Sequence, residues 1–438
     1  MAPRRKKSKK PPATSSGIDN QPDAVLEHIL GLLPVHEAVR TCVLARRWRH
    51  LWKYNTRLHI TRSHPCDIEQ TAVKNIREFV DHVLLIRGSS PVDVCEIDLL
   101  DFDDEDMPSM NQWIRHVITC KVRDLSVRFF REHDEPWLKL DEQPLISKHL
   151  TKLKLFDLWF DDNFVDLSRC PALEELEING CYVASVDGIS SVSLKHLSIG
   201  CSCILGQSFC NRINVPNLIS LQLHLNFDRA PVLEKMPSLV DATVNISWSE
   251  IDSCYKSNSG NCDNEHCESC YEIEGYNDSC FIFRRDMKKC PVISNLKILL
   301  LNEYWCVPTD LLTRILEHSP VLEKLTLELF CKGTKSKIEM KGRPDPKKQS
   351  STIFERLKLV EVKCDLVDEK VMNVLQFMMK LNIGKPRHQL CFLYFRDQVS
   401  DTKHKAANKE ISSPLIMTQA IVDAGPLHFS VPVSWARQ

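Results

Sequence analysis

Residues 173–178 read Leu-Glu-Glu-Leu-Glu-Ile, and segments of the same form, Leu-x-x-Leu-x-Leu, recur along the chain. The alternating apolar residues of each segment predict a short strand with one buried face. The first five segments begin 23, 21, 24 and 21 residues apart. Seven segments follow the form, the fifth degenerately, and they begin at Leu150, Leu173, Leu194, Leu218, Leu239, Leu322 and Leu357.

A recurrence of 20–29 residues with this core is typical of leucine-rich repeats. One unit cannot bury its own apolar face, so neighbouring units stack into a solenoid with a parallel sheet on its concave side. We find no Asn or Cys at the usual ladder position and therefore expect irregular repeats. An α/β fold class follows.

Proline helps to set the phase of the repeats. Pro171, Pro216, Pro237, Pro291 and Pro320 each stand two residues before an aliphatic residue. This spacing makes residues 293–298 one more repeat, although residues 296–301 fit the Leu-x-x-Leu-x-Leu form equally well. We therefore expect repeats over residues 92–335.

A segment rich in Cys, Asn, Ser and acidic residues interrupts the repeats at about residues 247–290. We expect a long loop projecting from the array. Cys267 and Cys270 have the spacing of half a zinc knuckle, and Cys262 could add a third ligand. A second Cys-x-x-Cys pair is missing, so a loop with reduced thiols is the favoured interpretation and these three cysteines are only weak candidates for a metal site.

Residues 18–60 predict three short helices. Val25, Leu26, Ile29, Leu30 and Leu33 recur at helical spacing after Asp23, which can cap the first helix. A second helix is expected near residues 38–43, and a third places Leu44, Trp48, Leu51 and Trp52 on one face. So small a unit cannot bury this much apolar surface alone, which predicts a docking surface for a partner.

The remaining segments are less informative. Residues 1–17 form a basic, disordered tail that could serve as a nuclear import signal. An amphipathic linker helix is expected within residues 61–91. The acidic stretch Asp98–Asp106 is interpreted as a solvated loop, because it lacks the spacing of a calcium-binding loop.

Composition excludes several classes of protein. The chain carries 57 Lys and Arg against 58 Asp and Glu, so its net charge of −1 gives no electrostatic preference for nucleic acid or for anionic membranes. No apolar stretch of about 18 residues predicts a transmembrane helix. The basic N-terminus has no apolar core of a secretory signal. We expect an intracellular protein whose 19 cysteines are reduced thiols.

No motif for catalysis stands out. We find neither a nucleophile elbow, nor a His-Glu-x-x-His motif, nor a Gly-rich phosphate loop. The chain is therefore expected to be no enzyme and to need no cofactor.

Residues 18–60 resemble an F-box. The match runs through Pro22–Leu30, Leu32–Pro34, Ala38–Trp48 and Leu51–Trp52, and it is similar to the large plant group that combines F-box, leucine-rich repeats and a C-terminal FBD segment. The stretches Cys170–Leu176 and Ser319–Leu325 resemble the repeats of that group. Residues 354–383 resemble the start of its FBD element, a strand followed by a helix, which we place at 350–395. Residues 396–438 depart from the family as a divergent tail.

The resemblance implies a substrate receptor of an SCF-type cullin-RING ubiquitin ligase, located in the nucleus, the cytoplasm or both. The F-box would bind a Skp-type adaptor and, through it, a cullin, while the repeats would hold a protein substrate. Carried over by position, nine residues would build or support the docking surface: Pro22, Leu26, Ile29, Leu30, Leu33, Pro34, Trp48, Leu51 and Trp52.

One departure concerns the residue before the first proline. The family usually has leucine there, and this chain has Gln21. Losing one buried aliphatic side chain would cost about 1.5–3 kcal/mol, unless a neighbour such as Ile18 replaces it. The alternative function is a repeat scaffold with a degraded F-box and no role in a ligase. A third hypothesis, a nucleic-acid or metal-dependent protein that uses the basic tail and the Cys-rich loop, is disfavoured.

Overall fold

The computed structural model divides into two compact units. Unit 1 comprises residues 1–138 and 147–151, and unit 2 comprises residues 139–146 and 152–438. The structure describes residues 18, 21–61, 70–100, 104–130, 138–140, 143–161, 166–184, 188–200, 204–205, 212–225, 232–246, 293–302, 309–330, 356–364, 369–380, 389–394 and 418–421.

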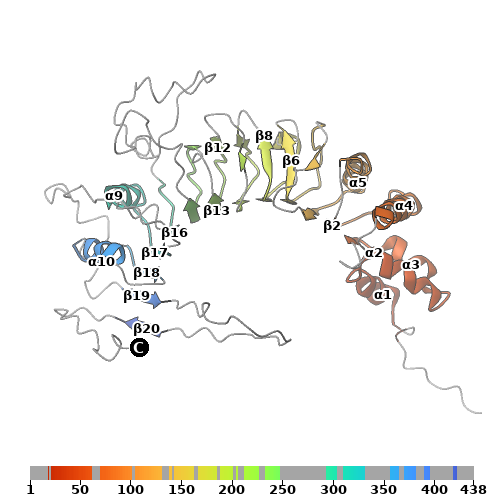
Figure 1. Ribbon diagram of the computed structural model, residues 1–438, viewed down its shortest axis with the longest axis horizontal. Coiled ribbons are helices and arrows are strands. Elements are labelled where there is room, and N and C mark those ends of the chain that lie inside the picture. Colours follow the sequence, from red (N-terminus) through yellow and green to blue (C-terminus); the bar gives the residue numbers. More distant parts are fainter. Residues whose placement is uncertain are drawn as a thin grey trace, which may run out of the picture. The chain divides into compact units, whose positions relative to one another are not determined.

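Unit 1 begins with the three short helices expected from the sequence (Figure 1). Pro22 and Pro34 stand at the N-caps of the first two, where their fixed φ suits a helix start. The prediction that Asp23 caps the first helix is wrong, because Asp23 is its first residue and no side chain caps it. The bounds are α1 Asp23–Leu30, α2 Val35–Arg40, the short 3-10 turn η2 Thr41–Val43, and α3 Trp48–Tyr54.

The rest of unit 1 alternates strands and helices. The strands pair in parallel in the order β1, β2, β3, and each connection contains one helix. The segment interpreted as a linker helix therefore connects two paired strands, as in a βαβ unit. The bounds are β1 Arg57–Thr61, α4 Gln70–Arg87, β2 Val94–Leu100, α5 Met107–Thr119 and β3 Asp124–Phe130.

The interpretation of the acidic stretch as a solvated loop is wrong at both ends. Asp98 lies in β2, and the next residue, Leu99, is fully buried. Asp106 is only 6% exposed and accepts a hydrogen bond from Arg77 Nη1 at 2.7 Å. The alternation of apolar residues, rather than the surrounding charges, determines that the start of this segment is a strand.

Unit 2 contains a long sheet in which each strand pairs with the strand of the following repeat. Nine strands run parallel and the last is antiparallel to its neighbour. In sheet order they are β5 Lys152–Phe156, β7 Glu175–Asn179, β10 His196–Ile199, β13 Ser220–Leu225, β15 Asp241–Ile246, β16 Ile298–Asn302, β17 Lys324–Leu329, β18 Leu359–Cys364, β19 Gln389–Tyr394 and β20 Thr418–Ile421.

Strand register decides between the two possible phases of the repeat near residue 296. Ala242, the fourth residue of its segment, pairs with Leu299, so the segment 296–301 is the repeat. Leu296, Leu299 and Leu301 are at most 3% exposed. Ile298, which the other phase would bury, is 43% exposed.

The phased prolines have a turn as their physical cause. The N–H of Leu173 donates to the carbonyl of Cys170, and Leu218, Leu239 and Leu322 each bond the residue three positions earlier in the same way. Proline stands directly after the acceptor residue, the position that its fixed φ favours in a β-turn. Pro291 stands five residues before Leu296 and is therefore out of this phase; it lies outside the described residues.

The prediction that no Asn or Cys stands at the usual ladder position is wrong for at least one repeat. Cys181 is the ninth residue of the repeat that begins at Leu173, which is the usual ladder position. Its Sγ donates to the carbonyl oxygen of Leu155 in the preceding repeat at 3.4 Å. Asn217 and Asn295 add a second set of such bonds, since their amides donate to Val192 O at 2.8 Å and to Pro237 O at 2.7 Å.

A second layer lies behind the sheet of unit 2 and changes along the array (Figure 1). Short strands form two small sheets behind the early repeats, and helices follow later. The FBD-like residues form β18 and then α10, a strand followed by a helix. The bounds are β4 Leu138–Lys139, β6 Leu158–Asp161, η3 Leu167–Arg169, β8 Tyr182–Ala184, β9 Ile189–Ser190, β11 Ile204–Leu205, β12 Arg212–Asn214, β14 Val232–Leu233, α9 Thr309–Glu317 and α10 Glu369–Lys380.

Three predicted segments lie wholly or largely outside the described residues. They are the basic tail 1–17, the insertion at about 247–290, and most of the divergent tail 396–438, of which β20 is described. Disorder of the tails and metal binding by the insertion remain predictions.

Candidate functional site

The nine residues predicted to form the docking surface divide into two groups. Leu26, Leu30, Trp48, Leu51 and Trp52 are at most 8% exposed and form the interior of the three-helix module. They can only support a surface. Pro22 is exposed, while Ile29, Leu33 and Pro34 are half-buried.

Other aliphatic side chains of the module are far more exposed. Val25 is 41%, Leu32 63%, Val43 83% and Leu44 70% exposed. We call these four residues the exposed aliphatic set. Leu44 was expected to share a face with the buried Trp48, but it precedes α3 and points to solvent.

Helical spacing explains how α1 can serve both the interior and the surface. Leu26 and Leu30 are four residues apart and face inward. Pro22 at the N-cap, Val25 and Ile29 follow at steps of three and four residues and therefore line up on another side of the helix, and Leu32 lies just beyond its end. The module thus exposes an apolar stripe, which a folded protein without a partner has no reason to keep.

Ion pairs tie the helices of the module to one another. Arg47 Nε donates to Asp23 Oδ1 at 2.7 Å and so joins the start of α3 to the start of α1. Arg40 pairs with Glu37 at 3.2 Å within α2. Burial lowers the pKa of His36, although the nearby Glu37 carboxylate acts in the opposite direction.

A buried arginine binds the C-terminal end of α3. Arg87, on α4, is 5% exposed, and its guanidinium donates to Trp52 O at 2.9 Å and to Asn55 O at 2.6 Å. These carbonyls lie at the C-terminal end of α3, where backbone acceptors lack helical partners. Helix α3 is thereby anchored to the first strand-helix repeat of unit 1.

The position before the first proline is open to solvent. Gln21 is exposed, and its backbone N–H bonds to Ile18 O at 3.1 Å. This turn brings Ile18 beside Gln21, and Ile18 is itself 51% exposed. Ile18 is thus an available substitute for the aliphatic side chain that the family usually has before the proline.

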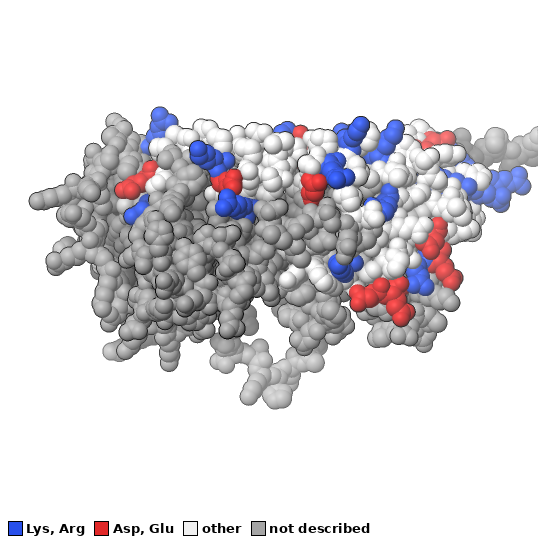
Figure 2. Space-filling view, turned by 90° about the horizontal axis from the view of Figure 1, so that it is seen from above, with Lys and Arg blue, Asp and Glu red and all other residues white. Residues whose placement is uncertain are grey.

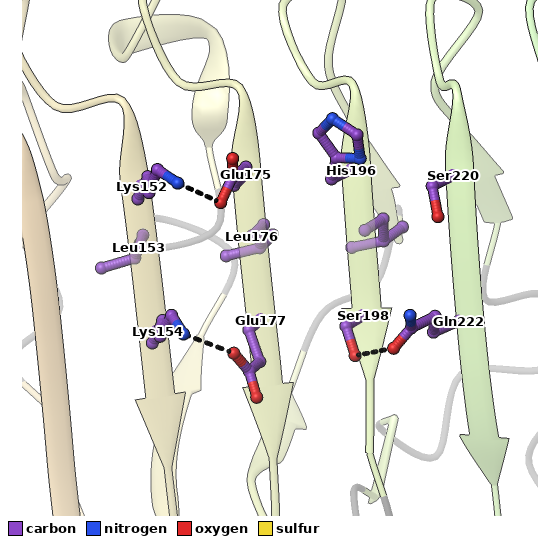
Figure 3. A pocket seen from close by; sticks show the side chains of 11 residues that line it. Lys152, Leu153, Lys154, Glu175, Leu176, Glu177, His196, Ser198, Ser220 and Gln222 are labelled. Carbon is purple, nitrogen blue, oxygen red and sulfur yellow. Dashed lines mark hydrogen bonds and ion pairs between the residues drawn. The ribbon is translucent and has the colours of Figure 1, made fainter.

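Unit 2 offers a second candidate surface on its main sheet, which we call the outer face. It consists of the third and fifth residues of each repeat, which point away from the buried fourth and sixth residues. Over β5, β7, β10 and β13 this face is polar and lines a shallow hollow of about 270 Å³ (Figure 3). Lys152 pairs with Glu175 at 2.9 Å and Lys154 with Glu177 at 3.1 Å.

On the face shown in Figure 2, the charges of the described residues do not gather into a field of one sign. In the view of Figure 2, described basic and acidic side chains lie among wide uncharged areas. The described part of this face therefore shows no basic stripe of the kind that tracks a nucleic-acid backbone.

Comparison with known proteins settles the nature of the three-helix module. Residues 22–59 match the F-box domain model. The module is an F-box. The observed F-box helices and the repeats that follow them in sequence agree with the names of the relatives, which support the plant F-box and leucine-rich-repeat family.

Three relatives from Arabidopsis thaliana illustrate the likeness. One named as an F-box protein is 28% identical over 259 residues, covering 51% of this chain and 55% of the relative. One named as an F-box/LRR-repeat protein is 26% identical over 386 residues, covering 71% and 80%. Another F-box/LRR-repeat protein is 30% identical over 189 residues, covering 42% and 37%. The matched part thus spans only about half the length of the first relative.

The described residues bring together no obvious chemical centre. Among them, no group of three or more His, Cys, Asp and Glu could hold a metal ion, and the weak zinc candidates Cys262, Cys267 and Cys270 lie outside them. Burial raises the pKa of the Cys95 thiol to about 12, which makes this cysteine a poor nucleophile. No helix in the described ranges is long and apolar enough to cross a membrane.

Sequence reasoning missed the exposed aliphatic set and Arg87 for different reasons. The family motif emphasises the interior residues of the module, which are its most regular positions. Val25, Val43 and Leu44 fit the helical pattern equally well, and only burial separates them from the interior. Nothing in the sequence could have indicated that an arginine on α4 binds the end of α3.

Proposed function

We propose that this F-box protein is the substrate-receptor subunit of an SCF-type cullin-RING ubiquitin ligase and has no catalytic residue of its own. The F-box binds a Skp-type adaptor and, through it, a cullin, while the repeats hold a protein substrate. The protein acts in the nucleus, the cytoplasm or both. The observation that carries the proposal is an F-box whose aliphatic side chains, Val43 and Leu44 above all, are left exposed.

The test is binding of the full chain to a purified Skp-type adaptor. Leu44→Asp replaces a side chain that is 70% exposed, so the module should still fold. Transferring one such side chain to an interface contributes about 1–2 kcal/mol, and introducing a charge adds to the loss. We expect the adaptor to bind at least about 10-fold more weakly.

The matched control is Val192→Asp, which alters an aliphatic side chain of unit 2 that is 76% exposed. Its adaptor affinity should equal that of the unaltered chain. Leu26→Asp is a poor test because Leu26 is fully buried, and a charge there would unfold the module. Absence of adaptor binding by the intact chain would refute the proposal.

A second candidate function is favoured by Gln21, which stands exposed where the family usually has leucine. On this reading the protein is a repeat scaffold with a degraded F-box. If Gln21→Leu is needed before any adaptor binds, the scaffold is correct. If the unaltered chain binds and Ile18→Asp weakens it, Ile18 fills the place of the missing leucine and the receptor is correct.

A further inference from the structure

The outer face of unit 2 changes character at β16. On β10 and β13 its residues are His196, Ser198, Ser220 and Gln222, all of them polar. On β16 the same two positions hold Ile298, which is 43% exposed, and Leu300, which is half-buried. These two side chains form an aliphatic step between the polar outer-face residues of β15 and β17, and the next aliphatic residue on this face is Leu359 on β18.

The fold does not require this step. The core of the repeat is already supplied by Leu299 and Leu301, on the opposite face of the same strand. The strands on either side fill the corresponding positions with polar residues: Asp241 and Lys324 pair with Ile298, and Thr243 and Thr326 pair with Leu300. Exposed aliphatic side chains rimmed by polar ones are typical of a binding site.

The charges beside the step are unequal. On β17, Lys324 is neutralised by Glu361 at 3.0 Å, and the same carboxylate accepts a hydrogen bond from Thr326. On β15, Asp241 has no ion pair with any residue in the described ranges. The two other lysines of this face named above, Lys152 and Lys154, are also paired. Among the described residues, the aliphatic step therefore borders one carboxylate without an ion-pair partner, that of Asp241.

We propose that this step binds a protein segment that places an aliphatic side chain on Ile298 and Leu300 and a Lys or Arg side chain against Asp241. The inference rests on the proposed function, because it names the feature of the substrate that the repeats recognise. An aliphatic contact supplies affinity through buried area, and the carboxylate selects the charge of the neighbouring residue.

Electrostatics disfavours other occupants of this surface. A nucleic-acid backbone or an acidic peptide would bring negative charge to Asp241, and Lys324 beside the step is already engaged by Glu361. These ligands serve as comparison probes in the test.

The test uses the full chain and immobilised 12-residue peptides of fixed neutral background. Each peptide carries a central Leu flanked by Lys, Gln or Glu, and a parallel set carries a central Ser. We expect the strongest binding for Leu flanked by Lys, with a loss of about 5- to 10-fold when Leu is replaced by Ser and a similar loss when Lys is replaced by Glu.

Variants locate the site. Ile298→Ser should weaken binding of every Leu peptide by about 5- to 10-fold, while Asp241→Lys should reverse the preference from Lys-flanked to Glu-flanked peptides. The matched control is Ile219→Ser, which removes a side chain that is 39% exposed at the second, not the third, position of its repeat. This control should bind like the unaltered chain.

Adaptor binding is measured in parallel, so the two proposals can fail separately. Equal binding of all peptides, preference for Glu-flanked peptides or oligonucleotides, or an unaltered preference in Asp241→Lys would overturn the inference while leaving the receptor function standing. Absence of adaptor binding alone would refute the receptor function. If peptides with Leu and Lys are still preferred and Asp241→Lys reverses the preference for Lys, the inference about the aliphatic step stands.

Discussion

A buried guanidinium normally faces a carboxylate, but Arg87 faces two backbone carbonyls at the end of α3. Burial lowers the pKa of Arg87, yet an arginine keeps its proton in proteins. The charge is stabilised because the C-terminal end of a helix carries partial negative charge. One side chain thus links the F-box to the repeat that follows it.

Arg87→Met should destabilise unit 1 by about 2–3 kcal/mol, because two buried carbonyls lose charged donors. Urea unfolding followed by tryptophan fluorescence measures the change. Arg46→Met is the matched control, since Arg46 is an exposed arginine of the same unit, and it should shift stability by less than about 0.5 kcal/mol. Equal effects of the two substitutions would show that the anchor contributes nothing.

His36 gives the F-box a dependence on pH. Because burial lowers its folded-state pKa below the ordinary value of 6.5, the unfolded chain binds the proton more tightly. Stability contributed by neutral His36 is fully present above about pH 6.5 and is lost as the pH falls below it. His36→Gln should reduce the difference in the free energy of unfolding between pH 5 and pH 7.5, as measured by urea unfolding at each pH. An unchanged difference would show that His36 is not the cause of the pH dependence.

At the scale of elements, the backbone hydrogen bonds between neighbouring repeats continue across the long insertion. The N–H of Lys297 donates to Val240 O at 2.8 Å, which continues the pattern of the earlier repeats across the insertion. Asn295 reaches back to Pro237 O in the same way as Asn217 reaches Val192 O. Strands β15 and β16 are therefore neighbours in space although about fifty residues separate them in sequence.

Replacing residues 250–289 by an eight-residue Gly/Ser linker should preserve unit 2. Loop-closure entropy varies slowly with length, so we expect a stability equal to that of the full chain or higher by about 1 kcal/mol. Urea unfolding and the far-ultraviolet circular dichroism spectrum measure this. A chain that cannot fold without the insertion would show that these residues take part in the core.

At the scale of the whole molecule, the two candidate surfaces belong to different compact units. The exposed aliphatic set lies in unit 1, and the aliphatic step on β16 lies in unit 2. Substitutions that share no contact partners add independently. The division matches the two tasks of the proposed receptor.

Leu44→Asp should therefore weaken adaptor binding at least about 10-fold while peptide binding stays within about twofold. Ile298→Ser should weaken peptide binding by about 5- to 10-fold while adaptor binding stays within about twofold. The double variant should combine both losses without further change. Titration of adaptor and peptide on each variant measures this, and a peptide affinity that depends on residue 44 would reveal coupling between the units.

The sequence predicted the three helices of residues 18–60, the linker helix and the order of the repeat strands, but not the short strands of the second layer. Period-two apolar residues repeated at 21–24 residues require stacked parallel strands, because no single repeat buries its own face. The spacing of apolar residues predicted three helices in residues 18–60, and the resemblance of this segment to a known family indicated an F-box. These are local patterns, and a local pattern can be recognised in the sequence alone.

Only the tertiary structure decided which side chains remain outside. Leu26 and Trp52 are buried in the interior and Val43 and Leu44 are exposed, although all four are apolar. Strand pairing across the insertion chose the phase that exposes Ile298. Exposure and pairing depend on neighbours distant in sequence, because the surface that covers a residue is supplied by other elements of the fold.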